Sequence, residues 1–331
     1  MRVGSIALVV GLLTFGLVAC GGSPAATKPK STPKPSGTAN VAYAASLENL
    51  NEKVIGPDFT KKTGYPYQGR GAGSKAVSAD IASGEISPNV FESVGGKPIE
   101  ALEPKFTSWY VQFAASPIVL AYNPQSQYAS QFEAIAKGTK PISSLFSLLE
   151  TPGLKLGRTD PNVDPQGAAF IEMLMLAQQT YNLPSDTVQN ILGAPASSSS
   201  SPEIFDEAAV LPRLQAGQLD CSSAYLSEAV QLHLKYISLP ASINLGDPSK
   251  AADYAKATFT LASGEAATGA PAVIDITTIG TTDKAAADAF VAYVLSSKGL
   301  ALHKQGGYSL LKPKIFGKKS AAPAAVRKEI S

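Results

Sequence analysis

Strand-like and helix-like segments alternate near the start of the chain, and this alternation constrains the possible folds more than any other feature. Residues 41–45 (VAYAA) form a short apolar run that is typical of a strand, and the apolar residues of segment 47–59 then recur at helical spacing. Residues 65–68 are again extended in character, residues 74–82 are helical, and residues 89–94 form a third strand-like run. Strands that alternate with helices predict an α/β fold with a largely parallel sheet.

The rest of the chain predicts a second lobe that is entered and left through single strands. Residues 115–124 form a strand-like run that leaves the first lobe, and residues 270–276 form one that returns to it. A clear helix follows at residues 284–295. The chain therefore crosses twice between two lobes, which we expect to comprise residues 40–120 with 272–331, and residues 121–271.

The first twenty residues predict a lipoprotein signal peptide. The apolar run at residues 6–18 is shorter than the roughly 18 to 20 residues that span a bilayer. Residues 17–20 (LVAC) resemble a bacterial lipobox, in which Cys20 becomes the lipid-bearing first residue of the mature protein; the alternative is an ordinary signal peptide with a chance cysteine. Residues 21–39 contain no large apolar side chain and predict a disordered tether. We expect the protein on the extracellular face of the cell membrane, or in a periplasm.

Charge and cysteine content weigh against several classes of protein. Charged residues make up 16% of the chain and the formal net charge is +2, so a nucleic-acid partner is not expected. If Cys20 is acylated, Cys221 is the only remaining thiol and no intramolecular disulfide forms. Cys221 matches no catalytic signature with His233 or His303, and the chain lacks a G-x-S-x-G elbow. We therefore expect neither an enzyme nor a cofactor.

Two serines stand where strand-like runs pass into helices. Ser46 follows the first run, and Ser74 follows the glycine-rich stretch 69–73. For each serine alone the simpler interpretation is a helix cap. Two such helix starts in one domain also offer free N–H groups and the positive ends of helix dipoles to an anion. No Lys-Ser/Thr pair follows Gly73, so ATP hydrolysis is not indicated.

The segment 157–167 (GRTDPNVDPQG) raises a separate question, because it holds two Asp-Pro pairs. An acid/base pair and a calcium-binding loop are two possible functions of this segment, but it has too few oxygen ligands for calcium. As a turn, it places Asp164 at a helix N-cap and Pro165 at the first helical position. The functional alternative is that Gln166 and Gly167 offer further helix-start N–H groups to the same anion.

Four segments together resemble the extracellular solute-binding proteins of ABC importers for molybdate and tungstate. They are VAYAASLENLNEKVIGPDFTKKTGY, GRGAGSKAVSADIASGEISPNVF, GRTDPNVDPQG and LDCSSAYLSEAVQLHLKYISLPASINLGDP, and the resemblance runs from about Val41 to Leu311. It implies a two-lobed fold of the periplasmic-binding-protein (type II) kind, with a hinge of two crossover strands. It also implies one oxyanion in the cleft, passed to a membrane permease, and we expect a monomer.

The resemblance assigns roles residue by residue. Ser46 and Ser74 would donate hydrogen bonds from the first lobe, and Gln166, through its backbone N–H, and the Tyr225 phenol would donate from the second. Asp164 matches a carboxylate that approaches the metal centre of the anion, a role that suits molybdate or tungstate because a carboxylate repels sulfate or phosphate.

One position departs from the branch that this sequence most resembles. That branch has a glutamate directly before the tyrosine, where this chain has Ala224, and Glu228 lies three residues past Tyr225. Two interpretations stay open: a tetrahedral anion held by hydrogen bonds with Asp164 as a cap, or direct approach of Asp164 to the metal. Sulfate, phosphate, an organic anion or a ferric ion remain alternative ligands, and the roles of Arg70 and Arg158 are open.

Overall fold

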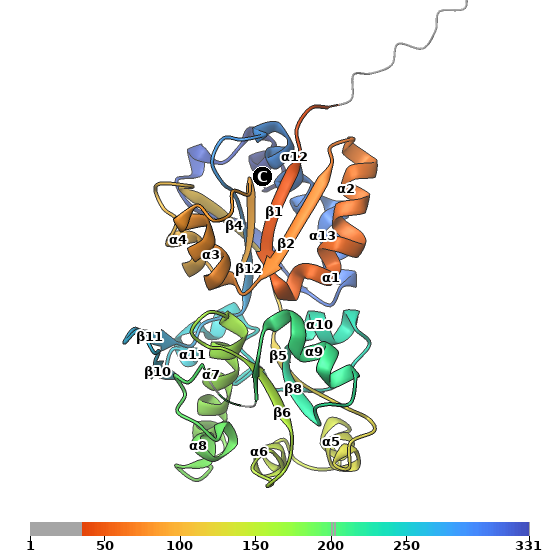
Figure 1. Ribbon diagram of the computed structural model, residues 1–331, viewed down its shortest axis with the longest axis vertical. Coiled ribbons are helices and arrows are strands. Elements are labelled where there is room, and N and C mark those ends of the chain that lie inside the picture. Colours follow the sequence, from red (N-terminus) through yellow and green to blue (C-terminus); the bar gives the residue numbers. More distant parts are fainter. Residues whose placement is uncertain (1–34, 200, 202, 331) are drawn as a thin grey trace, which may run out of the picture. The chain divides into compact units, whose positions relative to one another are not determined.

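The computed structural model describes residues 35–199, 201 and 203–330. Their main elements are two mixed β-sheets, each covered by helices (Figure 1). The signal peptide, Cys20 and most of the expected tether lie outside the described residues. Ala39, which we expected at the end of the tether, is the first residue of a strand and is fully buried. Its N–H donates to Pro66 O at 2.9 Å, so the folded part begins before Val41.

The sheet of the first lobe has six described strands in the order β13-β4-β12-β3-β1-β2. β1 pairs in parallel with β2 and β3, whereas β12 and β13 run antiparallel to their neighbours. The prediction of a largely parallel sheet is therefore wrong for β12 and β13. β12 begins where the chain returns from the second lobe, and it runs antiparallel to β3 and β4. The strands are β1 (Ala39–Ala44), β2 (Tyr67–Ala72), β3 (Val90–Val94), β4 (Trp109–Ala115), β12 (Val273–Thr278) and β13 (Ser309–Gly317).

Helices cover both faces of this sheet. Along β1, Ala42 packs in one apolar cluster with Val77 and Ile81, while Val41 and Tyr43 belong to the main core on the other face. A strand buried on both faces is typical of α/β proteins. The helical segments of the lobe are η1 (Ala45–Leu47), α1 (Glu48–Leu50), the π-helical η2 (Asn51–Ile55), α2 (Gly56–Thr63), α3 (Ser74–Ser83), α4 (Lys97–Glu100), α12 (Lys284–Leu295), α13 (Ser297–Gln305), η4 (Lys319–Ala321) and α14 (Ala324–Ile330).

The sheet of the second lobe has five described strands in the order β7-β6-β8-β5-β9. β6 pairs in parallel with β7 and β8, and β5 runs antiparallel to β8 and β9. The strands are β5 (Ile118–Tyr122), β6 (Leu156–Thr159), β7 (Ile204–Phe205), β8 (Cys221–Tyr225) and β9 (Lys235–Ser238), and the short hairpin β10 (Thr258–Thr260) and β11 (Ala266–Thr268) stands apart from them.

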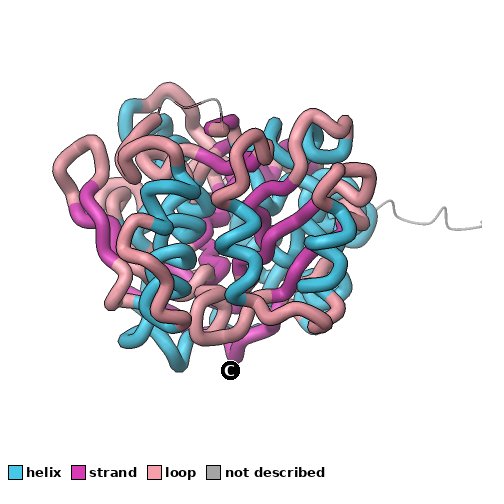
Figure 2. The backbone as a smooth tube through the Cα atoms, turned by 90° about the horizontal axis from the view of Figure 1, so that it is seen from below, coloured by secondary structure: helices cyan, strands magenta, loops and turns pink. Residues whose placement is uncertain are grey.

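Helices also cover this second sheet, and the tube view shows strands enclosed by helices (Figure 2). α7 contacts β5, β6 and β8, whereas α9 packs with Val119 and Ala224 in a separate apolar cluster. The helical segments are α5 (Ala129–Ala136), α6 (Ser143–Leu149), α7 (Pro165–Thr180), α8 (Thr187–Leu192), α9 (Glu207–Gln215), α10 (Leu226–Gln231), η3 (Pro248–Lys250) and α11 (Ala251–Tyr254).

The two crossovers between the lobes lie side by side. The first is the pair Ser116-Pro117, between β4 and β5, and the second ends at Ala272, directly before β12. Ser116 N–H donates to Ala272 O at 2.9 Å, so the two connections are hydrogen-bonded to each other. Two short adjacent connections are the geometry of a hinge, in which a few residues absorb the change in backbone angles.

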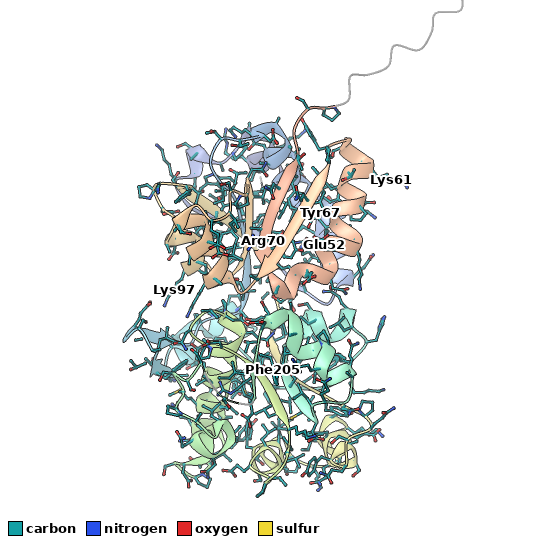
Figure 3. All side chains as sticks on the ribbon, in the orientation of Figure 1. Glu52, Lys61, Tyr67, Arg70, Lys97 and Phe205 are labelled. Carbon is teal, nitrogen blue, oxygen red and sulfur yellow. The ribbon has the colours of Figure 1, made fainter. Side chains whose placement is uncertain are left out.

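The glycines at 69 and 71, in the glycine-rich stretch before Ser74, lie in β2. A Cβ at Gly69 would overlap Glu52 Oε1, and one at Gly71 would lie 2.7 Å from the Tyr43 ring. Glu52 Oε1 accepts hydrogen bonds from the hydroxyls of Tyr43 at 2.7 Å and Tyr67 at 2.9 Å (Figure 3). These two glycines therefore admit packing within the first lobe and do not approach a ligand.

Glu92 in β3 predicts a pH-dependent stability that is independent of any ligand. It is fully buried, accepts a hydrogen bond from Asn51 Nδ2, and burial raises its pKa from 4.5 to about 7. A carboxyl whose pKa is raised by folding stabilises the protein below its unfolded pKa, and this stability is lost as pH rises from 4.5 to 7. We predict that Glu92→Gln removes a loss of roughly 3 kcal/mol between pH 5 and 8, at about 1.4 kcal/mol per pKa unit.

Urea unfolding of the wild type and of Glu92→Gln at pH 5 and pH 8 measures this difference. Glu85→Gln is the control, because Glu85 is exposed. An identical change in unfolding free energy with pH in all three proteins would contradict the assignment.

Candidate functional site

Ser46 lies at the end of β1 that faces the second lobe. It is the second residue of η1, and Ala44, not Ser46, occupies the N-cap position, so the expected cap is wrong. The chain turns into the helix two residues earlier than the sequence predicted. The side chain is 4% exposed, and its Oγ has no hydrogen-bond partner within the described part of the chain. A buried hydroxyl without a partner is costly unless a ligand or water satisfies it.

Ser74 opens α3, as predicted, and is fully buried. Its Oγ accepts a hydrogen bond from Val94 N–H at 3.1 Å, which ties the start of α3 to the end of β3. A serine hydroxyl that accepts one hydrogen bond still has its own proton to donate. The N–H groups of Ser74 and Lys75 belong to the first helical turn, where no intrahelical acceptor exists.

Asp164 is the N-cap of α7 and Pro165 its first residue, as the turn interpretation predicted. Asp164 Oδ1 accepts a hydrogen bond from Gln166 N–H at 3.0 Å, whereas Oδ2 is buried and unpaired among the described residues. The Gln166 N–H that we expected to face a ligand is therefore held by Asp164. Gly167 leaves no room for a Cβ, which would overlap Thr159 O, so the helix start sits tightly on the end of β6.

Tyr225 is the last residue of β8 and is 1% exposed. Its hydroxyl has no partner in residues 35–199, 201 and 203–330. Burial raises the pKa of this phenol well above its usual value, and the nearby charges of Asp164, Glu207 and Glu228 act in the same direction. The phenol is therefore a neutral donor that lies close to three carboxyl groups.

Glu228 belongs to the site, although the sequence assigned it no role. Its Oε2 accepts hydrogen bonds from Gln166 Nε2 and from Tyr225 N–H, both at 2.8 Å. The Gln166 amide is fixed on its other side by Ser223 Oγ, which donates to Oε1 at 3.1 Å. Burial raises the pKa of Glu228 to about 8, and the Asp164 charge contributes to the increase.

Glu207 is a second carboxyl that sequence reasoning missed. It is the first residue of α9, a helix that contacts η1, and it is 7% exposed. Burial raises its pKa well above the usual value, the charges of Asp164 and Glu228 add to this, and the nearby Ser46 hydroxyl and N–H oppose it. No sequence spacing links Glu207 to Ser46, because only the packing of the two lobes brings them together.

The electrostatic balance of the site is acidic. Burial also raises the pKa of Asp164 to about 6, against the effect of its hydrogen bond from Gln166. Glu172, about two helical turns further along α7, has its pKa raised to about 7 by burial, although the charges of Lys75 and Lys97 lower it. Near pH 7 Glu228 is therefore mostly neutral and can donate a proton, Glu172 is partly ionised, and Asp164 is mostly ionised.

The start of α3 contacts the loop before α7 directly. Lys75 Nζ donates to Pro161 O at 3.2 Å, and Ala76 N–H donates to Val163 O at 3.3 Å. A Cβ at Gly73 would lie 2.7 Å from Val163 O, so only glycine allows this approach without a shift. These contacts bring Ser74 from the first lobe beside Asp164 from the second.

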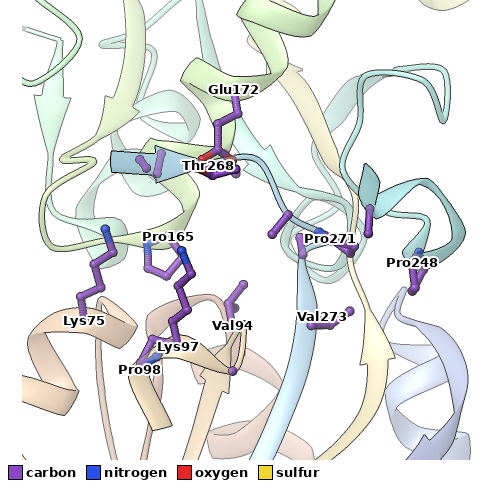
Figure 4. Close-up of a pocket in the computed structure, with 18 of the residues that line it drawn as sticks. Lys75, Val94, Lys97, Pro98, Pro165, Glu172, Pro248, Thr268, Pro271 and Val273 are labelled. Atoms are coloured by element: carbon purple, nitrogen blue, oxygen red, sulfur yellow. The ribbon is translucent and has the colours of Figure 1, made fainter. Parts of the chain in front are cut away.

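A cavity of about 360 Å³ lies beside this contact; Lys75, Pro165 and Tyr225 form part of its wall, whereas Ser46, Ser74 and Asp164 do not. Figure 4 shows Lys75 and Lys97 projecting into this region from the first lobe and Glu172 projecting from α7. Most of the lining is apolar and includes Val94, Pro98, Ala168, Ala169, Leu261 and Val273. The cavity therefore combines apolar walls with a few charged groups.

The two arginines that the sequence left open take no part in lining this cavity. Arg158 in β6 is fully buried, with its Nε 3.9 Å from Glu203 Oε2, and burial lowers its pKa. Arg70 in β2 is exposed and lies 3.8 Å from Asp80. Neither guanidinium therefore supplies a positive charge to the acidic site.

Cys221 is fully buried in β8, and burial raises the pKa of its thiol well above the usual value. A thiol in this state is not an activated nucleophile. Within the described ranges, no three His, Cys, Asp or Glu side chains are arranged to hold a metal ion. In the same ranges no single helix meets the length and hydropathy of a membrane span, although α12 and α13, bent by 61° at their junction, do so as a pair.

Two lobes joined by two adjacent crossovers, with buried unpaired polar groups between them, define a two-lobed binding protein. The sequence from residue 39 to 309 matches the model of the bacterial extracellular solute-binding proteins, and the chain belongs to that family. This is a family of solute-binding transport proteins and not a class of enzymes.

Two similar proteins come from archaea. A putative ABC transporter molybdenum-binding protein of Haloferax volcanii is 29% identical over 295 residues, which is 89% of each chain. A molybdate/tungstate-binding protein of Pyrococcus abyssi is 30% identical over 236 residues, 66% of this chain and 67% of the relative.

Solved structures show the same fold at low sequence identity. A periplasmic molybdate-binding protein of Azotobacter vinelandii has a TM-score of 0.55 at 19% identity, with 82% of this chain and 98% of that chain covered. A sulfate-binding protein of Mycobacterium tuberculosis has a TM-score of 0.54 at 13% identity, with 88% and 90% covered. The two-lobed α/β fold that the sequence predicted is thereby confirmed.

The contact of Gly73 with Val163 predicts a substitution that acts on the closed arrangement of the lobes. In Gly73→Ala the new methyl group must displace the Asp164 loop, and overpacking of this kind costs about 1 to 3 kcal/mol. We predict a loss of ligand affinity of at least fivefold with little change in the thermal unfolding of the ligand-free protein. Calorimetric titration and thermal melts measure the two effects, and unchanged affinity would contradict the role of this contact.

Proposed function

We propose that the protein is the receptor of an ABC importer that binds molybdate or tungstate between its lobes and delivers the anion to a permease. The observation that carries the proposal is a set of buried polar groups at the meeting of the lobes that form no hydrogen bond with the described residues. They are Ser46 Oγ, Asp164 Oδ2, the Tyr225 hydroxyl and the Glu207 carboxyl. Buried groups of this kind are usually satisfied by a ligand. The names of the archaeal relatives support these two anions.

In this proposal the anion is held from both lobes. Ser46 donates its hydroxyl and Ser74 donates its hydroxyl and helix-start N–H groups from the first lobe. Tyr225 donates from the second lobe, and Gln166 orients Asp164 and Glu228 through its hydrogen bonds to them. A ligand that contacts both lobes shifts the population toward the closed form in proportion to those contacts.

The role of Asp164 depends on how it meets the anion. An ionised carboxylate about 4 Å from a charge of the same sign costs around 4 kcal/mol at an effective dielectric of 20, and this cost is the same for sulfate and molybdate unless the metal accepts the carboxylate oxygen. Asp164 therefore selects molybdate or tungstate over sulfate only by direct approach to the metal. The unpaired Oδ2 is the atom that would either face the metal centre or donate its proton to an anion oxygen. With Ala224 before Tyr225, the tetrahedral hydrogen-bonded anion is the interpretation we favour.

We further propose that the protein is a monomer held at the outer membrane surface by lipid on Cys20, without catalytic activity. The support is the lipobox-like LVAC stretch and the polar composition of residues 21–39. Metabolic labelling with a fatty-acid probe tests the anchor. Loss of label in Cys20→Ala is the expected outcome.

Isothermal titration of the wild type with molybdate, tungstate, sulfate and phosphate tests the ligand. We expect heat with the first two, and a loss of affinity of at least tenfold in Ser46→Ala and in Tyr225→Phe, because a hydrogen bond to a charged group contributes about 1.5 to 3 kcal/mol. Ser83→Ala is the matched control, since Ser83 is exposed at the end of α3. No heat with any of the four anions would exclude the proposal.

The cavity favours a second candidate, an oxyanion that carries a small organic group. Its volume of about 360 Å³ lies within the range of roughly 300 to 1,000 Å³ that small organic ligands occupy, and its walls are mostly apolar. Titration with phenylphosphonate beside phosphate distinguishes the candidates. Binding of phenylphosphonate without binding of molybdate would favour the organic anion, whereas the reverse would favour the first proposal.

A further inference from the structure

We propose that Glu207 is a specificity-determining residue that binds the oxyanion as a neutral acid, donating its carboxyl proton to an anion oxygen. The inference rests on the proposed function and assigns one more group to the same site. No covalent bond changes in this step: the carboxyl keeps its proton, or takes one from solvent as the lobes close.

The position of Glu207 supports a direct contact with the ligand. As the first residue of α9 it lies next to Ser46 of η1, across the boundary between the lobes. It is 7% exposed, and its carboxyl lies beside the hydroxyl and the N–H of Ser46, although neither carboxyl oxygen forms a hydrogen bond of ordinary geometry in the described part of the chain. Ser46 Oγ, also buried and unpaired, is the second group that points to a ligand here.

The charges around Glu207 favour the neutral form. Asp164 and Glu228 are the carboxyls whose charges reach it, and Glu48 and Glu52 line a second cavity of about 220 Å³ with it and with Ser46. Lys53 also lines that cavity, together with Glu48 and Glu52.

The strands and the helix that pack against α9 add no compensating cation. Arg158 in β6 lies beside Glu203, Arg70 in β2 lies beside Asp80, and the β8 neighbour is the neutral Tyr225. Lys75 is bonded to Pro161 O. An ionised Glu207 would therefore face both a dianion and other carboxyls, with Lys53 as the one cation among the residues that line its cavity.

Protonation resolves this conflict and supplies a donor. A neutral carboxyl presents one O–H group, which matches the oxyanion oxygens in the same way as the hydroxyls of Ser46 and Tyr225. Ala224 leaves the site without the second carboxylate that metal coordination would use, and a donor at Glu207 serves a tetrahedral anion instead. The site would then accept an anion by hydrogen bonds from several neutral groups.

The sign of the pH dependence follows from linkage. If the anion binds only the form with Glu207 neutral, the Kd is constant while Glu207 is protonated in the free protein. The Kd then rises tenfold per pH unit once the free protein loses that proton. Asp164 and Glu228 add their own dependence, so the informative quantity is the difference in slope between the wild type and a variant without a titratable group at position 207.

The experiment titrates molybdate into the full-length protein between pH 6 and pH 9.5, with the wild type, Glu207→Gln, Glu207→Ala and the exposed control Glu85→Gln. Glutamine cannot titrate but keeps an N–H donor, whereas alanine has none. We expect Glu207→Gln to bind within about threefold of the wild type at pH 6 and to lose about one unit of slope of log Kd against pH at the alkaline end. We expect Glu207→Ala to bind at least tenfold more weakly at every pH.

Three results would overturn the inference while leaving the proposed function intact. One is a wild-type slope retained in Glu207→Gln, and another is equal loss of affinity in the glutamine and alanine variants. The third is X-ray absorption of the complex that gives six ligands around molybdenum in the wild type and fewer in Glu207→Gln, which is the behaviour of a metal-bound carboxylate. Failure of the wild type to bind molybdate at any pH would instead remove the proposed function itself.

Discussion

The contact between the start of α3 and the loop before α7 is the interaction on which the site depends. Ala76 N–H reaches Val163 O across the two lobes, and the absence of a side chain at Gly73 permits the approach. This single contact brings two helix N-termini together, one from each lobe, and helix N-termini are the backbone sites best suited to an anion. The adjacent crossovers at Ser116 and Ala272 are hydrogen-bonded to each other and have the geometry of a hinge between the two sheets.

The chemical character of the site is set by burial and not by net positive charge. Asp164, Glu207 and Glu228 lie close together. Arg70 of the first sheet and Arg158 of the second sheet each lie beside another acidic residue. Burial raises the pKa of each of the three carboxyls. In our proposal the site recognises the anion through hydrogen-bond donors, and its affinity then depends on geometry and on pH.

The sequence predicts a local feature correctly where the residues that form it are neighbours in the chain. Ser74 opens a helix after a glycine, and Asp164 with Pro165 forms an N-cap, because both features depend on a few consecutive residues. The sequence predicts that Ser46 is a helix cap, but Ser46 lies inside η1 and its hydroxyl is unpaired among the described residues. The Gln166 N–H was assigned to a ligand, although the side chain two residues earlier holds it.

The sequence by itself determined the alternation of strands and helices, the two lobes and the helix starts that carry Ser74 and Asp164, since these follow from short-range periodicity and capping. Only the tertiary structure decided that Glu207 and Glu228 belong with Ser46 and Tyr225. It also decided that two strands of the first sheet run antiparallel to their neighbours. The reason is physical: whether a carboxyl is buried, unpaired and close to another depends on segments that are far apart in the chain and meet only when the two lobes pack.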